Sequence, residues 1–502
     1  MADIVNTPNT DTKTSVRQSL ASKPEPPSPG KNFLGIRHAM VVPLIVACAM
    51  FMEMVDANVI TTALPLIARD FGKDPLTLKL GLSAYLISLA VFIPISGWIA
   101  DRFGSRVVFC AAIAIFMVSS MLCGLSQSFT FFVVVRFIQG IGGAMMVPVG
   151  RIVIVRTVER EDLVTAFIYL TIPATLGPLT GPVLGGFIAT YFSWRWIFFI
   201  NVPISIVGII FALRFMDNYR ESEVPPLDVV GFVLSALGLS LFMFGMSTIS
   251  DQMMPRKWAA ICIVMGAVIV YAYLRRARTE TKPLLDFSFF KLKTYMVGVG
   301  GGSIYRIGFG AIPFLLPLML QLGFGLSPFR SGVLTCASAI GSLFIRTMTK
   351  KLLQIFGFRN LLGYNALLAS ITIAALGLFT ARTPHTVIFL VLLVGGGFRV
   401  MQFTALNTIC YAEVPERDVS QATSLFATIQ QLAMGMGVTV GAFCLQASNF
   451  FQHHSQIVAA DFAPAFLAVG LFCAVSAYSA FSLSPDSGAE MAGRAATGSA
   501  NS

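Results

Sequence analysis

The sequence predicts an all-α integral membrane protein with about 14 transmembrane helices. Of the 502 residues, 56% are hydrophobic and only 12% are charged, about half the charged fraction of a typical soluble domain. The mean hydropathy is +0.78. The apolar residues form separate runs of about 20 residues, the length that a helix needs to cross a bilayer. Together these observations exclude an ordinary soluble protein.

Each apolar run predicts one span. The expected spans are 39–62, 80–100, 107–126, 130–150, 165–190, 197–216, 229–249, 257–275, 296–321, 330–350, 360–380, 386–410, 421–448 and 463–483. An even number of spans places both termini on one side of the membrane. Lys and Arg are about threefold more abundant in the connections on that side, and such connections prefer the cytoplasm. We therefore expect both termini to be cytoplasmic.

A short repeat suggests how the spans are grouped. Phe103-Gly-Ser-Arg-Val107 follows the second span, and Phe356-Gly-Phe-Arg-Asn360 follows the tenth, although the second copy has no counterpart of Asp101. Two related six-helix bundles with two inserted helices would place these segments at equivalent positions. The expected divisions are a disordered cytoplasmic tail at 1–38, a first bundle at 39–216, an inserted helix pair and loop at 217–294, a second bundle at 295–483, and a cytoplasmic tail at 484–502.

The composition excludes several other functions. The net charge of +11 fits basic cytoplasmic loops facing anionic membrane lipids, so we expect no nucleic-acid partner. The eight cysteines and four histidines show no metal-ligand spacing, and no nucleophile–base pair or phosphate-binding loop is present. We expect no enzyme activity, metal or cofactor, so transport would draw on an ion gradient.

The turn between the second and third spans is the most specific motif. It reads Gly97-Trp-Ile-Ala-Asp-Arg-Phe-Gly-Ser-Arg106, and charge alone indicates only an ordinary cytoplasmic loop. Its spacing, G-x-x-x-D-R-x-G-x-R, resembles the signature loop of the major facilitator superfamily. The expected roles are close packing for Gly97, a tight bend for Gly104, and a cytoplasmic latch between the bundles for Asp101, Arg102 and Arg106.

Charged residues within the first bundle indicate proton coupling, because a charge inside a membrane is costly. Glu53 and Asp56 lie three residues apart on one face of the first span, and a carboxylic acid in an apolar site can bind and release a proton. Arg136, in the fourth span, lies at a similar height to Asp56, so the two can pair. The alternative is a static ion pair that only holds the helices together.

Three further motifs resemble the drug:proton antiporters of the superfamily. They are Asp56-Ala-Asn-Val-Ile-Thr-Thr-Ala-Leu-Pro65, Arg136-Phe-Ile-Gln-Gly140 and Leu176-Gly-Pro-Leu-Thr-Gly-Pro-Val-Leu-Gly-Gly186. Small residues and prolines in the last motif favour a helix that bends and slides against a neighbour, with static close packing as the alternative. The expected conformational residues there are Gly177, Pro178, Gly181, Pro182 and Gly185. Trp194-Arg-Trp-Ile-Phe-Phe-Ile-Asn-Val-Pro203 and the inserted helices resemble the fourteen-helix branch.

The second bundle has two intramembrane arginines, Arg306 in the ninth span and Arg399 in the twelfth. If both face a central cavity, they favour an anionic substrate; alternatively, each binds helix carbonyls or extends to the membrane interface. The candidate substrate-binding residues are Arg306, Arg399, Gln402, Asn407 and Gln430.

The resemblance implies a proton-coupled secondary transporter of the bacterial inner membrane, of the multidrug-resistance type found in Gram-negative bacteria. It would export drugs and toxic compounds by alternating access, with small-molecule substrates, protons and membrane lipids as its partners, and with a periplasmic adaptor and outer-membrane channel as further candidates. The alternative substrate is an organic anion or a metal-chelating carboxylate such as citrate. A non-transporting membrane sensor is the third hypothesis, against which the buried Asp56 argues.

Overall fold

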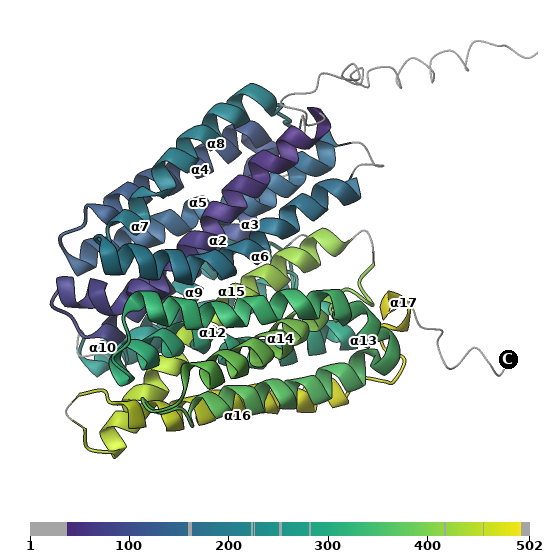
Figure 1. Ribbon diagram of the computed structural model, residues 1–502. Helices are drawn as coiled ribbons and strands as arrows, with labels where there is room; N and C mark the ends of the chain where they lie inside the picture. The colour runs from purple at the N-terminus through teal and green to yellow at the C-terminus, as the bar shows by residue number, and fades with distance from the viewer. Residues whose placement is uncertain are drawn as a thin grey trace, which may run out of the picture.

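The computed structural model describes residues 38–158, 163–221, 224, 226–249, 254–280, 283–415, 418–454 and 456–492. Helices are the only regular secondary structure in these residues. They form two groups that lie side by side (Figure 1). The predicted tail at 1–38 lies outside the described residues except for His38, as does the part of the C-terminal tail beyond residue 492.

The first group contains the first six spans. Its helices are α2 (His38–Asp70), α3 (Lys79–Phe103), α4 (Ser105–Gly124), α5 (Phe129–Thr157), α6 (Leu163–Tyr191), the short α7 (Trp196–Phe199) and α8 (Asn201–Phe215), with η2 (Pro75–Leu78) before α3. The Ser128 side chain caps α5 by accepting a hydrogen bond from the Phe131 amide at 3.2 Å. Helix α2 packs against α5, α6 and α8, which places it at the centre of the group.

The inserted pair, α9 (Val229–Thr248) and α10 (Arg256–Ala277), covers the seam between the groups. Helix α9 packs against both α3 and α15. The Phe92 ring of α3 lies 5.9 Å from the Phe232 ring of α9, and the Ser247 and Thr439 hydroxyls lie 2.9 Å apart between α9 and α15. The pair therefore contacts both groups, with α10 on the lipid-facing side.

The second group contains the last six spans. Its elements are η3 (Phe287–Lys291), α11 (Lys293–Tyr295), η4 (Met296–Gly301), α12 (Gly302–Leu318), η5 (Met319–Gly323), α13 (Pro328–Leu376), α14 (His385–Ile409), α15 (Val419–Phe451), η7 (Ala459–Asp461), α16 (Phe462–Phe481) and α17 (Ala489–Ala492). Two of them, η4 and η5, are π-helical turns at either end of α12. Glycines in η4 and the prolines Pro313 and Pro317 in α12 weaken regular α-helical bonding there, which explains these departures.

The spans agree with the predicted fourteen. Twelve described helices are long and apolar enough to cross a membrane, and one of them, the 49-residue α13, holds both the tenth and eleventh spans. Helix α6 provides the fifth span. The chain reverses within α13 at Gly357, whose φ is +70°. Gly104 has a φ of +96°, so both copies of the predicted repeat place a glycine in a conformation that other residues rarely adopt.

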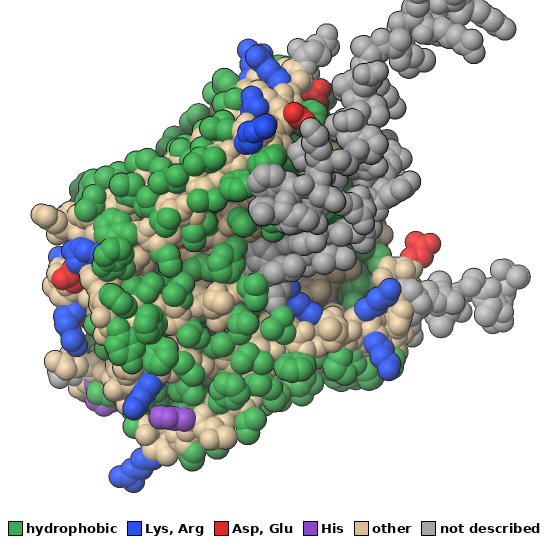
Figure 2. Space-filling view, turned by 45° about the horizontal axis from the view of Figure 1, so that its top comes forward, with side chains coloured by type: hydrophobic (Ala, Val, Ile, Leu, Met, Phe, Trp, Pro, Cys, Tyr) green, Lys and Arg blue, Asp and Glu red, His purple; other side chains and the backbone are tan. Residues whose placement is uncertain are grey.

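Charge distinguishes the two ends of the molecule from its sides. In Figure 2 the Lys and Arg side chains in view gather at the ends, and apolar side chains cover most of the surface between them. We call the end with Arg102, Arg106, Arg156 and Arg276 the basic end; the other is the opposite end. The two helix groups diverge toward the basic end in Figure 1, where α17 also lies.

Gly104 provides a test of this turn. We expect Gly104→Ala to lower the free energy of unfolding by about 1–2 kcal/mol, because a positive φ disfavours a side chain. A Cβ there would also meet the Asn218 side chain. Thermal unfolding followed by tryptophan fluorescence measures the change. The matched control is Gly97→Ala, whose added Cβ meets nothing within 4 Å; equal melting temperatures for the two variants would contradict the prediction.

Candidate functional site

The centre of the first group is an ion pair shielded from solvent. Helix periodicity places Glu53 and Asp56 on one face of α2, and α5 brings Arg136 to the same depth. The Arg136 Nη1 lies 2.7 Å from the Asp56 Oδ2, and both side chains have 0% exposure. The pairing expected from helix geometry is therefore present. A buried ion pair stabilises a protein only where further hydrogen bonds complete it.

Neutral side chains supply such hydrogen bonds to the Asp56 carboxylate, whereas the buried Arg136 Nε and Nη2 have no hydrogen-bond partner among the described residues. Gln139, one turn after Arg136, donates to the Asp56 Oδ1 at 3.2 Å and accepts from the Arg136 Nη1 at 2.6 Å. Asn201, at the start of α8, donates to the same Asp56 oxygen at 2.9 Å and contacts the Ser120 hydroxyl of α4 at 2.9 Å. Helices α2, α5 and α8 thus meet at one carboxylate, and α4 holds Asn201 in place.

Glu53 is bonded much less completely than Asp56. It is only 4% exposed, and its Oε1 lies 3.5 Å from the Tyr85 hydroxyl, a long contact. No described residue makes a hydrogen bond to its Oε2. Tyr85 also places its ring 4.6 Å from the Arg136 guanidinium. The two carboxylates therefore differ: Asp56 is held by an arginine and two amides, whereas Glu53 has one weak partner.

Glycines after Arg136 bring α3 close to this site. A Cβ at Gly140 would lie 2.7 Å from the Tyr85 carbonyl oxygen, and one at Gly143 would lie 2.8 Å from the Tyr85 hydroxyl. Any larger residue at these two positions would push α3 away from α5. The motif around Arg136 thus places the arginine and, through its glycines, allows Tyr85 to reach it.

Helix α6 lies between α2 and α13 and remains helical through Pro178 and Pro182. Gly177 faces Met54, and a Cβ at Gly181 would lie 2.6 Å from the Cβ of Asn58. The predicted conformational glycines Gly177, Gly181 and Gly185 therefore form a flat contact with α2, the helix that carries Glu53 and Asp56. On its other side α6 meets α13, where the Pro182 carbonyl faces Gly332.

Two hydrogen bonds join the groups near the opposite end. The Phe329 amide donates to the Thr190 hydroxyl at 3.1 Å, and the Gln321 side chain donates to the Thr62 carbonyl at 2.9 Å. The Phe329 ring also lies 6.2 Å from the Phe187 ring. These contacts, and the divergence of the groups in Figure 1, describe a conformation that is closed at the opposite end.

The basic turn bonds within its own group in this conformation. Arg156 of α5 lies 3.1 Å from the Asp101 carboxylate and 2.8 Å from that of Glu221, and the Arg106 Nη1 donates to the Met216 carbonyl at 3.3 Å. Arg102 is exposed. Gly97 has open space beside it, so the expected close packing does not occur here. The expectation that Asp101, Arg102 and Arg106 hold the two bundles together stays a prediction. It applies to a conformation in which the basic end is closed.

The structure separates the two arginines of the second group. Arg306 donates from Nη1 to the Gly298 carbonyl and from Nη2 to the Asn407 side chain, both at 2.9 Å. Arg399 instead donates to the Ser338 hydroxyl of α13 at 2.9 Å. The two side chains therefore do not form one clamp.

The amides predicted with these arginines also differ in their surroundings. Gln402 is bonded within the α13–α14 contact, to Asn365 at 2.9 Å and to the Leu362 carbonyl at 3.0 Å. Gln430 of α15 has a buried Oε1 to which no described residue donates. Asn407 lines a cavity of about 380 Å³ near the basic end of α14.

Four members of the first site were missed as site residues from the sequence. Gln139 and Asn201 stand inside motifs that were identified, but no pattern shows that their amides reach Asp56. Tyr85 and Ser120 have no sequence signal, because uncharged residues are common in apolar spans and only packing brings Tyr85 to Glu53 and Ser120 to Asn201.

Removing one partner of the buried pair tests its role. We expect Arg136→Gln to lower the free energy of unfolding by about 3–5 kcal/mol, because Asp56 would stay charged without its cation. In Asp56→Asn/Arg136→Gln neither charge remains, so the double variant should be less destabilised than the sum of the single ones by at least about 1 kcal/mol. Thermal or denaturant unfolding of the purified proteins measures this coupling; strict additivity would show that the pair is not energetically coupled.

Comparison with known proteins agrees with this architecture. The family model described as the Major Facilitator Superfamily matches residues 46–438 and 298–501. A "Putative multidrug resistance protein MdtD" of Serratia proteamaculans (strain 568) is 35% identical over 413 residues, which cover 82% of this chain and 86% of the relative. The protein of the same description from Klebsiella pneumoniae (strain 342) is 35% identical over 425 residues, or 84% and 89% of the two chains.

Solved transporter structures share the fold at low sequence identity. The POT family transporter PepTSo has a TM-score of 0.65 at 13% identity and covers 88% of this chain and 96% of its own. A bacterial homolog of the human lysosomal transporter Spinster, in an inward-facing and unoccupied conformation, has a TM-score of 0.63 at 16% identity with the same coverage. The motifs, the helix arrangement and these matches agree: the chain is a multi-pass membrane protein that belongs to the major facilitator superfamily.

Proposed function

We propose that this protein exports hydrophobic drugs and toxic compounds in exchange for protons. The observation that carries the proposal is the pair of buried carboxylates on α2, one ion-paired and one nearly without partners. The relatives described as putative multidrug resistance proteins support the substrate class. An uncompensated carboxylic acid inside a membrane protein marks a proton or substrate site.

Glu53 is the residue that we propose exchanges the proton first. Glu53 is buried, its Oε2 has no hydrogen-bond partner among the described residues, and none of their ion pairs includes it, which makes it the carboxylate most open to proton exchange. A cationic or strongly polarisable substrate near Glu53 would favour the charged form and release the proton. Asp56 would serve as the second acidic group, with Arg136 and Gln139 holding its carboxylate in place.

The conformational cycle would use the flat face of α6. With Gly177, Gly181 and Gly185 against α2, a change at Glu53 or Asp56 reaches α6 and then α13 through direct packing. In the proposed orientation the basic end faces the cytoplasm of a bacterium and both termini lie there, so the described conformation would receive substrate from inside. Association with a periplasmic adaptor and an outer-membrane channel stays a prediction.

Proton release on substrate binding tests the exchange. Tetraphenylphosphonium, a lipophilic cation, is added to purified protein in weakly buffered detergent solution, and the pH change is recorded. We expect release from the wild type and at least a tenfold loss in Glu53→Gln, because a carboxamide has no acidic proton that substrate binding could release. Glu413→Gln is the matched control, since Glu413 accepts a hydrogen bond from the Thr294 amide at 3.2 Å within the second helix group. Equal release by all three proteins would refute Glu53 as the proton site, and binding without any release would refute the exchange itself.

The pH dependence of binding is a second test. Protons compete with the cation for the same carboxylate, so raising the pH should tighten binding, by up to tenfold per pH unit where one proton is displaced. Calorimetric titrations at several pH values measure this slope. The slope should vanish in Glu53→Gln, and a pH-independent affinity in the wild type would contradict direct competition.

A further inference from the structure

The two helix groups differ in the sign of their buried charge. The first has the carboxylates of Glu53 and Asp56 against the single cation of Arg136. The second has Arg306 and Arg399, which are 0% and 3% exposed. None of the ion pairs found among the described residues includes either arginine. A buried cation that has only neutral partners favours binding of an anion.

The chain builds a specific place for the Arg306 guanidinium. The π-helical turn η4 presents the Gly298 carbonyl, which accepts from the Arg306 Nη1 at 2.9 Å. A Cβ at Gly302 would lie 2.5 Å from the same nitrogen, so a larger residue there would displace the guanidinium from this position. The rings of Phe403 and Phe426 lie 5.7 and 5.0 Å from the guanidinium carbon. The Arg306 Nε is buried, and no described group accepts from it.

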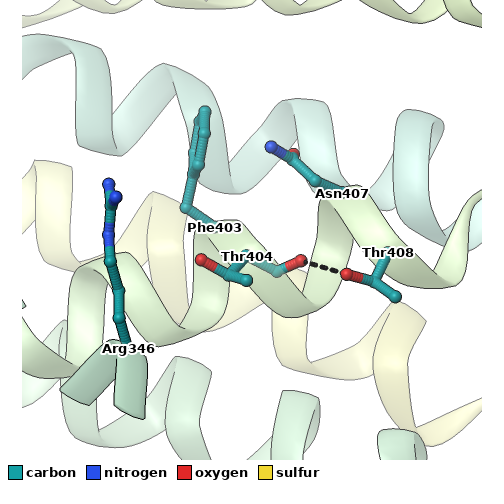
Figure 3. A pocket seen from close by; sticks show the side chains of 5 residues that line it. All are labelled: Arg346, Phe403, Thr404, Asn407 and Thr408. Atoms are coloured by element: carbon teal, nitrogen blue, oxygen red, sulfur yellow. Dashed lines mark hydrogen bonds between the residues drawn. The ribbon is translucent and has the colours of Figure 1, made fainter. Parts of the chain in front are cut away.

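A cavity of about 380 Å³ lies directly beside this arginine. Its lining residues are Arg346 of α13 and Phe403, Thr404, Asn407 and Thr408 of α14. In Figure 3 the side chains of Arg346, Phe403 and Asn407 point to the same side of their helices. Two of them contact Arg306: Asn407 accepts its hydrogen bond at 2.9 Å, and Phe403 lies against its guanidinium. Arg306 therefore lies next to the cavity, in contact with two of its lining residues, and Arg346 lines the same cavity.

The chemistry of the lining selects the ligand. Because the Asn407 oxygen accepts from Arg306, its amide nitrogen remains to donate into the cavity. The Thr408 hydroxyl already donates to the Thr404 carbonyl at 2.9 Å. Among the described residues that line the cavity there is no carboxylate, and this part of the lining combines a guanidinium, an amide donor and an aromatic ring. A carboxylate would pair with the cations, and an apolar body would cover Phe403.

We propose that this cavity binds a small organic anion that has one carboxylate and an apolar body. Arg346 contacts the carboxylate. Arg306 acts through Asn407, because its hydrogen bond to the Asn407 oxygen makes the Asn407 amide a stronger donor to the anion. The inference rests on the proposed transport function only in treating the cavity as part of the substrate route. It extends the substrate class of the exporter to amphipathic carboxylates, which the second helix group would bind while the first binds the proton.

The test is calorimetric binding of 4-phenylbutyrate and of 4-phenylbutyramide, its neutral analogue, to the full chain in detergent without a gradient. We expect the carboxylate to bind at least tenfold more tightly than the amide. Arg346→Gln should remove that preference, whereas Lys351→Gln, which deletes an exposed cation on the same helix, should keep it. Equal affinities of the wild type for the two compounds, or an equal loss in both variants, would overturn the proposal.

Asn407→Asp gives an independent test, because it places a permanent carboxylate against Arg306 without changing the size of the side chain. We expect the variant to fold, with an unchanged or higher melting temperature, and to lose at least tenfold of its affinity for 4-phenylbutyrate while its affinity for the amide is kept. Retained carboxylate preference would overturn the role of Arg306. Proton release with tetraphenylphosphonium is a separate measurement, so either proposal can fail while the other stands.

Discussion

The buried ion pair between Asp56 and Arg136 constrains the whole first group of helices. Three helices supply its members and their hydrogen-bond partners, and a fourth, α4, holds Asn201 through Ser120, so each helix must keep its rotation and depth for these bonds to remain. Glycines rather than larger residues lie beside the arginine because Tyr85 must approach it. The hydrogen bonds to Asp56 and the close approach of Tyr85 to Arg136 allow a polar cluster to exist inside an otherwise apolar group of helices.

The second group accommodates its buried charges differently. Arg306 and Arg399 bind carbonyl and hydroxyl oxygens and aromatic rings, and none of the described ion pairs balances them. The two halves of the molecule thus differ in how their buried charges are distributed. In the proposed cycle, the half with carboxylates takes up the proton, and the half with arginines contacts the anionic part of a substrate.

Helix α6 connects the two halves because small residues allow close contact on both of its sides. Gly181 lies against α2, and Pro182 lies against Gly332 of α13. About two turns further along α6, the Phe329 amide bonds to Thr190, so the contact at the opposite end is specific as well as close. The basic turn makes its bonds within the first group, to Arg156 and Met216, and none of its bonds to described residues reaches the second group.

The sequence by itself determined the membrane class, the fourteen spans and the pairing of Asp56 with Arg136, because apolar length, charge cost and helix rise are local properties. It also identified the turn glycine Gly104, whose φ proved to be +96°. Only the tertiary structure decided that Asp56 is fully bonded while Glu53 is not, and that Arg306 and Arg399 point to different places. Those facts depend on uncharged partners such as Asn201, Tyr85 and Ser338. Helix packing brings such residues together, and their spacing along the chain does not predict these contacts.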